Sequence, residues 1–235
     1  MPLEKVSNET LENYCKVIYT LSLGNGVDSQ RSAEGQKGAN QQRIADALGV
    51  TISGVSKMLR TMQRADLICY SPYHPVTLTE RGTKIALEVI RHHRLLELYL
   101  MKSLGFGWES VHREADRLEH YISEELEDRM EAALGYPAFD PHGDPIPSRN
   151  GQMPSFSRQS LASCELGTTA VISRVTDEDE ELLKYLADKG IRPGTSVKLL
   201  EREPFGGSLV VQVGDASDPE RLSPYAACHV FIEMR

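Results

Sequence analysis

The sequence predicts a mainly helical N-terminal part followed by a small all-β C-terminal domain. Apolar residues recur at helical spacing through most of residues 1–134. From residue 161 they fall instead in short runs separated by turn signals such as Pro193-Gly194 and Gly206-Gly207. A segment rich in Pro, Gly and Ser, residues 136–160, separates the two patterns. The 235 residues have room for one large domain or for two to three small ones, each with its own core.

Composition is that of a soluble globular protein, with 40% hydrophobic and 26% charged residues. The first residues, MPLEKVSNETLENY, include acids and lack an apolar run, so we expect no signal peptide, and no apolar run is long enough to span a membrane. The four cysteines are far apart and form no CxxC pair, which argues against disulfides and a zinc ribbon and favours a reducing cytoplasm. The net charge of −8 argues against a general polyanion binder.

Residues 3–23 are predicted to form the first helix, since Leu11, Tyr14 and Ile18 follow helical spacing. Residues 24–38 contain four glycines among mostly polar residues, and we expect a flexible surface loop there.

Residues 40–65 are predicted to form a helix-turn-helix. QQRIADAL gives a short helix that ends at Gly49, and a second helix follows, with Thr51 or Ser53 near its cap. Two short β-like runs, residues 67–70 and 76–78, surround a Pro-bearing turn and complete a winged helix.

The second helix of this motif offers small polar residues at its start and basic residues further along, a pattern that suits base edges and phosphates respectively. Residues 41–64 carry four basic residues against Asp46 alone. We therefore predict DNA binding, although a helical hairpin without nucleic acid would have a similar pattern. The expected DNA contacts are Arg43, Thr51, Ser53, Gly54, Ser56, Lys57, Arg60, Arg64 and, in the wing, His74.

Residues 83–104 are predicted to form one long helix that is apolar on more than one side, which indicates a helical dimerisation domain with a subunit interface. His93 and Glu97 are four residues apart on it and share a face. Trp108, in the turn that follows, is expected to anchor packing.

Residues 109–134 are predicted to form one helix, with His112, Asp116, Glu119 and His120 at i, i+4, i+7 and i+8. At about 100° per residue these four side chains fall within an arc of roughly 100°. Each is a metal-ligand type, whereas a helix that only packs would carry leucines there. This face is predicted to bind divalent metal.

The C-terminal 75 residues or so are predicted to form a small SH3-like barrel. The expected strands are residues 169–175, 196–201, 208–213 and 229–233, and DEDEELLKYLADKG gives one short acidic helix between the first two.

The order of these parts resembles the diphtheria toxin repressor / iron-dependent repressor family, which includes manganese transport regulators. The resemblance covers nearly the whole chain. It is carried by the winged helix-turn-helix, HHRLLELYL, VHREADRLEH and DPHGDPIP, the last in place of the family's CPHGNPIP. The C-terminal part resembles the SH3-like, FeoA-like domain of longer members.

The resemblance implies a homodimeric, metal-activated repressor of operator DNA, with two metal sites per subunit and no enzymatic activity. It implies a division into a winged helix-turn-helix domain (residues 1–82), a helical dimerisation and metal-binding domain (83–147), a linker (148–160) and an SH3-like domain (161–235). The ancillary metal site would use His93, Glu97 and His112, together with Glu178 and Glu181 from the third domain. The primary site would use Asp116, Glu119 and His120, together with Asn13 from the first helix.

Two departures from the family pattern bear on the metal. Iron-type members carry Cys at the position of Asp116 and Met at that of Asn13, so harder oxygen ligands here favour Mn²⁺ over Fe²⁺. Short manganese regulators, in turn, have Asp at the position of Asn13 and Glu at that of Lys16, which argues against their binuclear arrangement.

Two other classes of protein were weighed. A di-metal carboxylate enzyme or metal store would have two Glu-x-x-His motifs on facing helices, and this sequence has one, Glu109 to His112. An adaptor that binds proteins through the SH3-like domain is compatible with the acidic C-terminal part. The chain has no Gly-rich phosphate loop, nucleophile elbow or HExxH motif.

Overall fold

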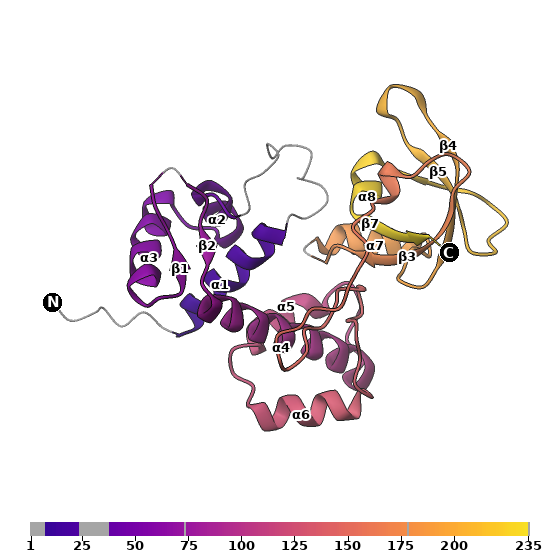
Figure 1. The fold of residues 1–235 in the computed structure, drawn as a ribbon. Coiled ribbons are helices and arrows are strands. Elements are labelled where there is room, and N and C mark those ends of the chain that lie inside the picture. Colours follow the sequence, from indigo (N-terminus) through magenta and orange to yellow (C-terminus); the bar gives the residue numbers. More distant parts are fainter. Residues whose placement is uncertain (1–7, 24–37, 73, 178, 235) are drawn as a thin grey trace. The chain divides into compact units, whose positions relative to one another are not determined.

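A computed structural model of the chain describes residues 8–23, 38–72, 74–177 and 179–234 (Figure 1). The chain divides into two compact units, Met1–His92 with Pro147–Gln152, and His93–Ile146 with Met153–Arg235. Each unit is described by itself. The expected loop at residues 24–38 lies, apart from Gly38, outside the described residues. The division into domains at residues 82, 147 and 160 stays a prediction.

The first unit contains the predicted helix-turn-helix. Its helices are α1 (Asn8–Leu23), α2 (Gln41–Leu48) and α3 (Ile52–Arg64). The Asn40 side chain accepts the amide hydrogen of Arg43 at the start of α2, and the Thr51 hydroxyl accepts that of Gly54 at the start of α3. Gly49 ends α2 with a left-handed backbone, so the chain can turn sharply between the two helices.

The wing is a short antiparallel hairpin of β1 (Ile68–Cys69) and β2 (Thr77–Leu78), in which Ile68 pairs with Leu78. Its apolar residues join the core of the first unit. That core includes Ile18, Ile44, Val55, Leu59, Met62, Ile68 and Val76. Burying the inward faces of α2 and α3 leaves the opposite face of α3 exposed.

The long helix α4 (Glu80–Leu104) begins three residues earlier than the sequence predicted and passes from the first unit to the second. Most of its apolar side chains are buried within one chain, including Leu87, Ile90, Leu95, Leu98 and Leu100. The excess of apolar surface that predicted a subunit interface on this helix is therefore largely accounted for inside the chain.

The expected single helix at residues 109–134 is wrong: the structure has α5 (Val111–Leu118) and α6 (Glu124–Ala133) with a turn between them. Ser123 starts α6, because its hydroxyl accepts the amide hydrogen of Leu126 at 3.3 Å and three acids follow in the first turn. His112 and Asp116 lie on α5, whereas Glu119 is its C-cap and His120 follows in the turn. Helical backbone geometry nevertheless continues through Glu119, whose amide donates to the Ala115 carbonyl at 2.9 Å.

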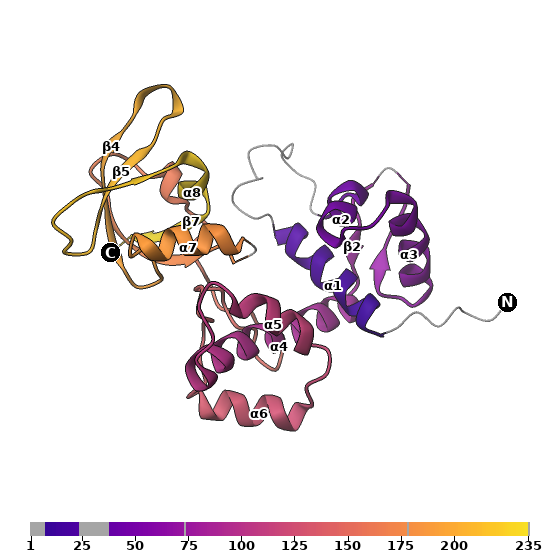
Figure 2. The same ribbon diagram turned by 180° about the vertical axis from the view of Figure 1, so that it is seen from behind.

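The C-terminal part has the predicted small antiparallel sheet, with α7 and α8 beside it (Figure 1, Figure 2). The strand order is β6-β5-β4-β3-β7. The strands are β3 (Thr169–Val175), β4 (Ser196–Arg202), β5 (Leu209–Val213), β6 (Glu220–Leu222) and β7 (Val230–Met234), and the helices are α7 (Glu180–Asp188) and α8 (Pro224–Cys228). Strand β6 and helix α8 were not predicted, since three and five residues are too short for a clear pattern.

The helical part of the second unit and its sheet share one hydrophobic core. Trp108, which precedes α5, is 5% exposed and packs with Ile172, Leu183, Leu199 and other sheet-domain residues. Its indole Nε1 donates to the Pro141 carbonyl at 2.9 Å, and the Arg192 guanidinium lies 4.6 Å from its ring centroid. The expectation of a packing anchor at Trp108 is confirmed.

Gly143 lets the segment that contains DPHGDPIP approach β3 closely. Its φ of +89° is in the left-handed region, and a Cβ built on it would lie 2.0 Å from the Ser173 carbonyl oxygen. The Val175 amide donates to the His142 carbonyl at 2.9 Å alongside. A glycine is therefore required for this contact between the helical part and the sheet.

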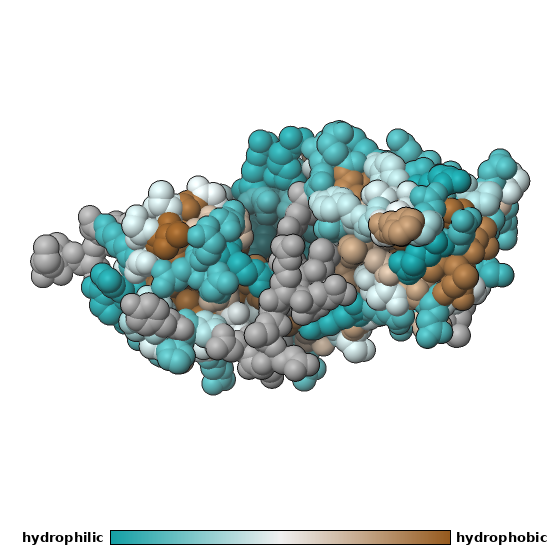
Figure 3. All heavy atoms as spheres, turned by 90° about the horizontal axis from the view of Figure 1, so that it is seen from above, coloured by the Kyte–Doolittle hydropathy of each residue, from teal (hydrophilic) through white to brown (hydrophobic). Residues whose placement is uncertain are grey.

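The surface is mainly hydrophilic on the face drawn in Figure 3, with hydrophobic residues in small patches. Among the described residues, no helix has the length and apolar character needed to cross a membrane.

We expect Gly143→Ala to lower the free energy of unfolding of the second unit by about 1–3 kcal/mol more than a control glycine substitution, because the added methyl group overpacks the contact with Ser173. Gly167→Ala is a matched control, since Gly167 has φ +82° and no atom within 4 Å of its built Cβ. Denaturant unfolding followed by Trp108 fluorescence measures the difference. Equal losses in the two variants would show that the close approach at Gly143 does not matter.

Candidate metal centre

Four side chains in the second unit place metal-ligand atoms within 4.8 Å of one another: His93, Glu97, His112 and Asp177. The Glu97 Oε1 atom lies 2.9 Å from His93 Nε2 and 3.0 Å from His112 Nδ1, and the two imidazole nitrogens are 2.9 Å apart. Asp177 Oδ2 lies 3.4 Å from His112 Nδ1. We call these four residues the imidazole-rich set.

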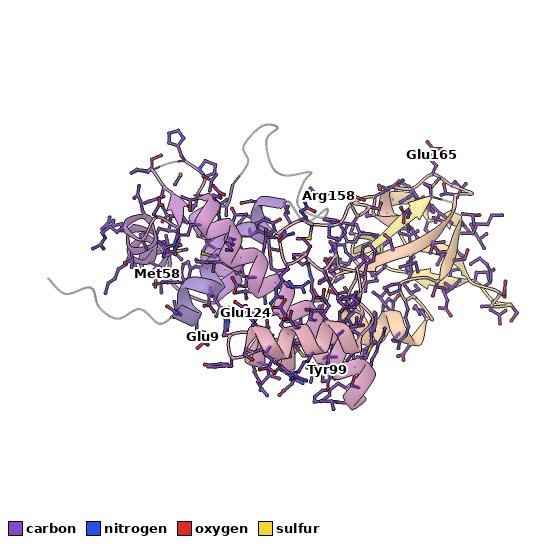
Figure 4. The ribbon with its side chains drawn as sticks, turned by 60° about the horizontal axis from the view of Figure 1, so that its bottom comes forward. Glu9, Met58, Tyr99, Glu124, Arg158 and Glu165 are labelled. Carbon is purple, nitrogen blue, oxygen red and sulfur yellow. The ribbon has the colours of Figure 1, made fainter. Side chains whose placement is uncertain are left out.

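The helices and one loop position this set. His93 and Glu97 are one turn apart on α4. Figure 4 labels Tyr99, which lies on the same helix. His112 is in the first turn of α5. Asp177 follows β3 and precedes α7, so the sheet domain supplies one ligand.

A second set of four overlaps the first and consists of Glu97, Asp140, His142 and Asp177, again with ligand atoms within 4.8 Å of one another. We call it the carboxylate-rich set. Glu97 and His142 are fully buried and Asp140 is 6% exposed. Glu97 Oε2, Asp140 Oδ2 and His142 Nδ1 are buried atoms without a hydrogen-bond partner. Buried polar atoms are nearly always satisfied, so these three atoms are available to bind a cation, beyond the ion-pair contacts of Asp140 with Arg94 and of Glu97 with His142, each at 3.7 Å.

The orientation of His142 supports this interpretation. Its Nε2 lies 2.8 Å from the Trp108 carbonyl oxygen, which can only accept, so Nε2 carries the hydrogen. Its Nδ1 faces Glu97 Oε2 at 3.7 Å. Two acceptors facing each other repel, and therefore Nδ1 either holds a proton or faces a metal ion. Metal-ligating histidines commonly have their other nitrogen fixed by such a carbonyl.

A third group contains His93, Asp116 and Glu119. His93 Nδ1 lies 2.5 Å from Glu119 Oε2 and 3.3 Å from Asp116 Oδ1, and His120 Nε2 lies 3.4 Å from Glu119 Oε1. The predicted primary-site residues Asp116, Glu119 and His120 thus lie together, and Glu119 also orients the imidazole of His93.

The remaining predicted ligands have other placements. Asn13 lies on α1 in the first unit, and its role as a ligand stays a prediction. Glu178 lies outside the described residues. Glu181 is on α7 with an 86% exposed side chain that pairs with Lys184, and it belongs to none of the three ligand groups among the described residues.

Sequence analysis missed Asp177, Asp140 and His142. Asp177 begins the acidic run that also contains Glu178 and Glu181. It differs from the other acids of that run in following closely on the end of β3 at Val175. Asp140 and His142 belong to DPHGDPIP, which served as a family marker and was not considered as a source of ligands. Its Asp-x-His spacing was the available signal.

Electrostatics in the ligand cluster favour the protonated forms of His112 and His142 and the ionised form of Glu97. Burial would lower the pKa of His112, but the Asp177 and Glu97 carboxylates outweigh burial and raise it to about 11. Burial opposes protonation of His142 as well, yet Glu97, Asp177 and Asp140 raise its pKa to about 10. Burial would raise the pKa of Glu97, but His93 and His112 hold it well below its usual range.

The pKa values of Asp140, from the carboxylate-rich set, and of the neighbouring Asp144 are instead raised. Burial, reinforced by the charges of Asp144 and Glu97, raises the pKa of Asp140 well above its usual range. Arg94 lies 3.7 Å from Asp140 Oδ2 and 3.2 Å from Asp144 Oδ1. The Arg174 guanidinium, from β3, lies 3.4 Å from Asp144.

The residues present fit a divalent metal ion. Imidazole nitrogen and carboxylate oxygen are ligands for Mn²⁺, Fe²⁺ and Zn²⁺. A tetrahedral site with bonds of about 2.0–2.1 Å holds its ligand atoms roughly 3.3 Å apart, close to the 2.9–3.0 Å separations among His93, Glu97 and His112.

The predicted DNA-contacting residues lie on α2, α3 and the wing. Thr51, Ser53, Gly54, Lys57, Arg60, Arg64 and His74 are exposed, and Arg43 is half-buried. The Ser56 hydroxyl donates to Gln41 Oε1 at 2.6 Å, and Gln41 Nε2 donates to the Tyr70 hydroxyl at 2.9 Å. Ser56 therefore helps to fix α3 against α2 and the wing.

Three family models match successive parts of the chain. Residues 7–76 match the iron dependent repressor N-terminal DNA binding domain. Residues 79–148 match the iron dependent repressor metal binding and dimerisation domain, and residues 159–234 match the FeoA domain.

Relatives and solved structures cover most of the chain. The iron-dependent repressor IdeR of Mycobacterium bovis is 34% identical and aligns with 88% of this chain and 90% of its own length. The diphtheria toxin repressor of Corynebacterium diphtheriae is 27% identical and aligns with 83% of this chain and 86% of its own length. A solved manganese-dependent transcriptional repressor in complex with manganese is 34% identical, with a TM-score of 0.83 over 96% of this chain and 100% of that one. The chain belongs to the iron-dependent repressor family.

Proposed function

We propose that this chain is a metal-activated transcriptional repressor that binds operator DNA as a homodimer, with Mn²⁺ as its preferred ion and Fe²⁺ as the alternative. The observation that carries the proposal is the buried cluster around Glu97, where ligand atoms converge and three of them have no hydrogen-bond partner. The match to a DNA binding domain and to a metal binding and dimerisation domain supports the DNA and dimer parts.

Two metal sites per subunit are proposed. Glu97 and Asp177, with the imidazoles of His93 and His112 or with Asp140 and His142, would hold the ancillary ion. Asp116, Glu119 and His120 would hold the primary ion, with Asn13 of α1 as the further ligand implied by the family. We place Asp177 in the role that the sequence had assigned to Glu178 and Glu181.

When bound, the metal ions would supply the positive charge that gathered carboxylates need in order to stay together. The ligands themselves belong to segments from different parts of the chain. Asp177 lies 3.4 Å from His112 of α5 and belongs to both ligand sets with Glu97 of α4, so it connects the sheet domain to these two helices. Metal binding thus favours one arrangement of these segments over others. To shift the chain from mostly incompetent to mostly competent for DNA binding, the metal must bind the competent arrangement more tightly by about 5 kcal/mol.

The exposed face of α3 would then enter the major groove. Ser53 and Gly54 at its N-terminal end are small enough for close approach to base edges, while Lys57, Arg60 and Arg64 suit phosphates and would make binding dependent on salt. In a homodimer, two such helices would meet half-sites about one helical turn apart.

Mn²⁺ is proposed because of the ligand types. Asp116 and Asn13 offer a carboxylate and an amide oxygen, and the carboxylate-rich set has three carboxylates and one imidazole. Mn²⁺ prefers such oxygen ligands to the softer Cys and Met side chains that iron-type members carry at these two positions.

Replacing Asp116 with alanine should abolish metal-stimulated DNA binding while the dimer persists, because a charged primary ligand is lost and the 48% exposed side chain contributes little to the core. DNA-binding anisotropy with and without Mn²⁺, beside size-exclusion light scattering, measures both properties. Asp215→Ala, in an exposed turn after β5, is the control and should behave as wild type. Normal metal stimulation in Asp116→Ala would refute the site assignment.

Ion preference is tested by anaerobic DNA-binding titrations with Mn²⁺ and Fe²⁺ at equal buffered free concentrations. We expect activation of DNA binding by Mn²⁺ to be at least equal to activation by Fe²⁺, because the proposed ligands include no thiolate or thioether. Much stronger activation by Fe²⁺ would contradict the argument from ligand type. EDTA should remove binding in both series.

Metal binding to the Glu97 cluster should release protons near pH 7.5. The pKa values of His112 and His142 are raised to about 11 and about 10, so both imidazoles are protonated without metal and must lose a proton to become ligands. We expect about one proton per imidazole that becomes a ligand. Calorimetric titrations in buffers of different ionisation enthalpy measure this number, and an identical heat in all buffers would contradict it. Metal affinity should accordingly fall as pH decreases.

A further inference from the structure

The start of α2 contacts the wing through the backbone. Ala39, two residues before α2, forms an antiparallel bridge with Val76 of the wing, in which each amide donates to the other's carbonyl, at 2.9 and 2.8 Å. Asn40 then caps the helix, and Gln41 is its first residue. The first turn of α2 is therefore placed directly beside the wing.

The Gln41 side chain connects the wing to α3. Its Oε1 accepts the hydroxyl of Ser56, on α3, at 2.6 Å, and its Nε2 donates to the hydroxyl of Tyr70, directly after β1, at 2.9 Å. All three side chains are half-buried, and the Tyr70 ring packs against the core of the first unit. Since an amide carries an acceptor and a donor side by side, one glutamine serves both hydroxyls at once.

The wing depends on such links because its own hairpin is short. Strands β1 and β2 have two residues each, and a hairpin of two strands is at best marginally stable by itself. Gln63, near the end of α3, also contacts the wing, since its Nε2 donates to the Tyr70 carbonyl at 2.9 Å. Tyr70 is thus held by α2 through its side chain and by α3 through its backbone.

Ser56 lies next to the face of α3 that is proposed to contact DNA. Lys57 follows it directly and Ser53 is about one turn earlier, and both of these side chains are exposed. Any shift of α3 at Ser56 therefore moves both exposed side chains. Hydrogen bonds to base edges need a defined geometry, whereas attraction between basic residues and phosphates does not depend on sequence.

We propose that Gln41 is a positioning residue that joins the wing to α3, so that both meet DNA at a fixed separation. The proposal rests on the proposed function, because it concerns how the same DNA-binding surface discriminates between sequences. Loss of the two hydrogen bonds of Gln41 lets the wing move relative to α3. Contacts with base edges then weaken, while attraction to the phosphates of any duplex remains.

The test compares two affinities of the Mn²⁺-loaded full chain, one for a duplex that the wild-type chain selects from a randomised pool and one for poly(dI-dC). Gln41→Leu keeps the approximate size of the side chain and removes both hydrogen bonds. We expect it to lower the affinity for the selected duplex about fivefold or more and the affinity for poly(dI-dC) less than about twofold.

Gln42→Leu is the matched control, because Gln42 is the next residue of the same helix, is exposed, and donates its amide to Asp46 at 2.7 Å. It should keep the wild-type ratio of the two affinities. Equal ratios in Gln41→Leu and Gln42→Leu would overturn the proposal.

The effects of Ser56→Ala and Tyr70→Phe show whether these residues act through Gln41. Each variant removes one of the two hydrogen bonds and should lower the affinity for the selected duplex. In the Gln41→Leu background neither should lower it further, because the link is already lost. Separate contacts of Ser56 and Tyr70 with DNA would give additive losses in that background, and such additivity would show the proposal to be wrong.

Hydrogen exchange without metal or DNA is an independent measurement. The Val76 amide, which donates to the Ala39 carbonyl, should exchange about fivefold faster in Gln41→Leu than in Gln42→Leu. Equal exchange would mean that Gln41 does not hold the wing. A wild-type chain without metal-stimulated DNA binding would contradict the proposed function, and the exchange rates would still decide whether Gln41 joins the wing to α3.

Discussion

The full burial of one ionised carboxylate, Glu97, is the constraint on which the second unit depends. A buried ionised group is costly unless it is paired and hydrogen-bonded. Here His93 and His112 satisfy one oxygen, while the other has no hydrogen-bond partner. Helices α4 and α5, the DPHGDPIP segment and the end of β3 all contribute groups to this one place, so its charge state affects how all four pack.

The DPHGDPIP segment links the helical part of the second unit to the sheet by three different kinds of contact. The His142 carbonyl accepts the Val175 amide, Gly143 lies against the Ser173 carbonyl, and Asp144 pairs with Arg174. Arg174 in turn lies 3.8 Å from the Phe231 ring centroid, so the ion pair is continuous with the sheet core. A segment without regular secondary structure thus fixes Asp140 and His142 as firmly as a helix would.

Local sequence pattern was sufficient to predict the long helices and strands. It was insufficient where tertiary contacts determine the course of the chain. The periodicity of α1 to α4 and the alternation in β3 to β5 could be predicted because each buries one face along its whole length. The break between α5 and α6 was missed because acidic and apolar residues continue through it, and only the Ser123 cap marks the new start. Among the ligands, His93, Glu97 and His112 could be chosen from spacing on helices. Asp177 and His142 lie on irregular segments, whose direction in space depends on the packing of Trp108 and Gly143.

The single tryptophan of the chain gives the molecule a reporter of its own. The Trp108 ring centroid lies 5.2 Å from that of His142, its carbonyl holds the His142 ring, and its indole is enclosed by the sheet core. A nearby protonated imidazole or a paramagnetic ion quenches indole emission, whereas a neutral imidazole bound to a closed-shell ion does not. The intrinsic fluorescence of the unlabelled protein is therefore an optical signal of which ion is present and of whether the sheet domain is still docked.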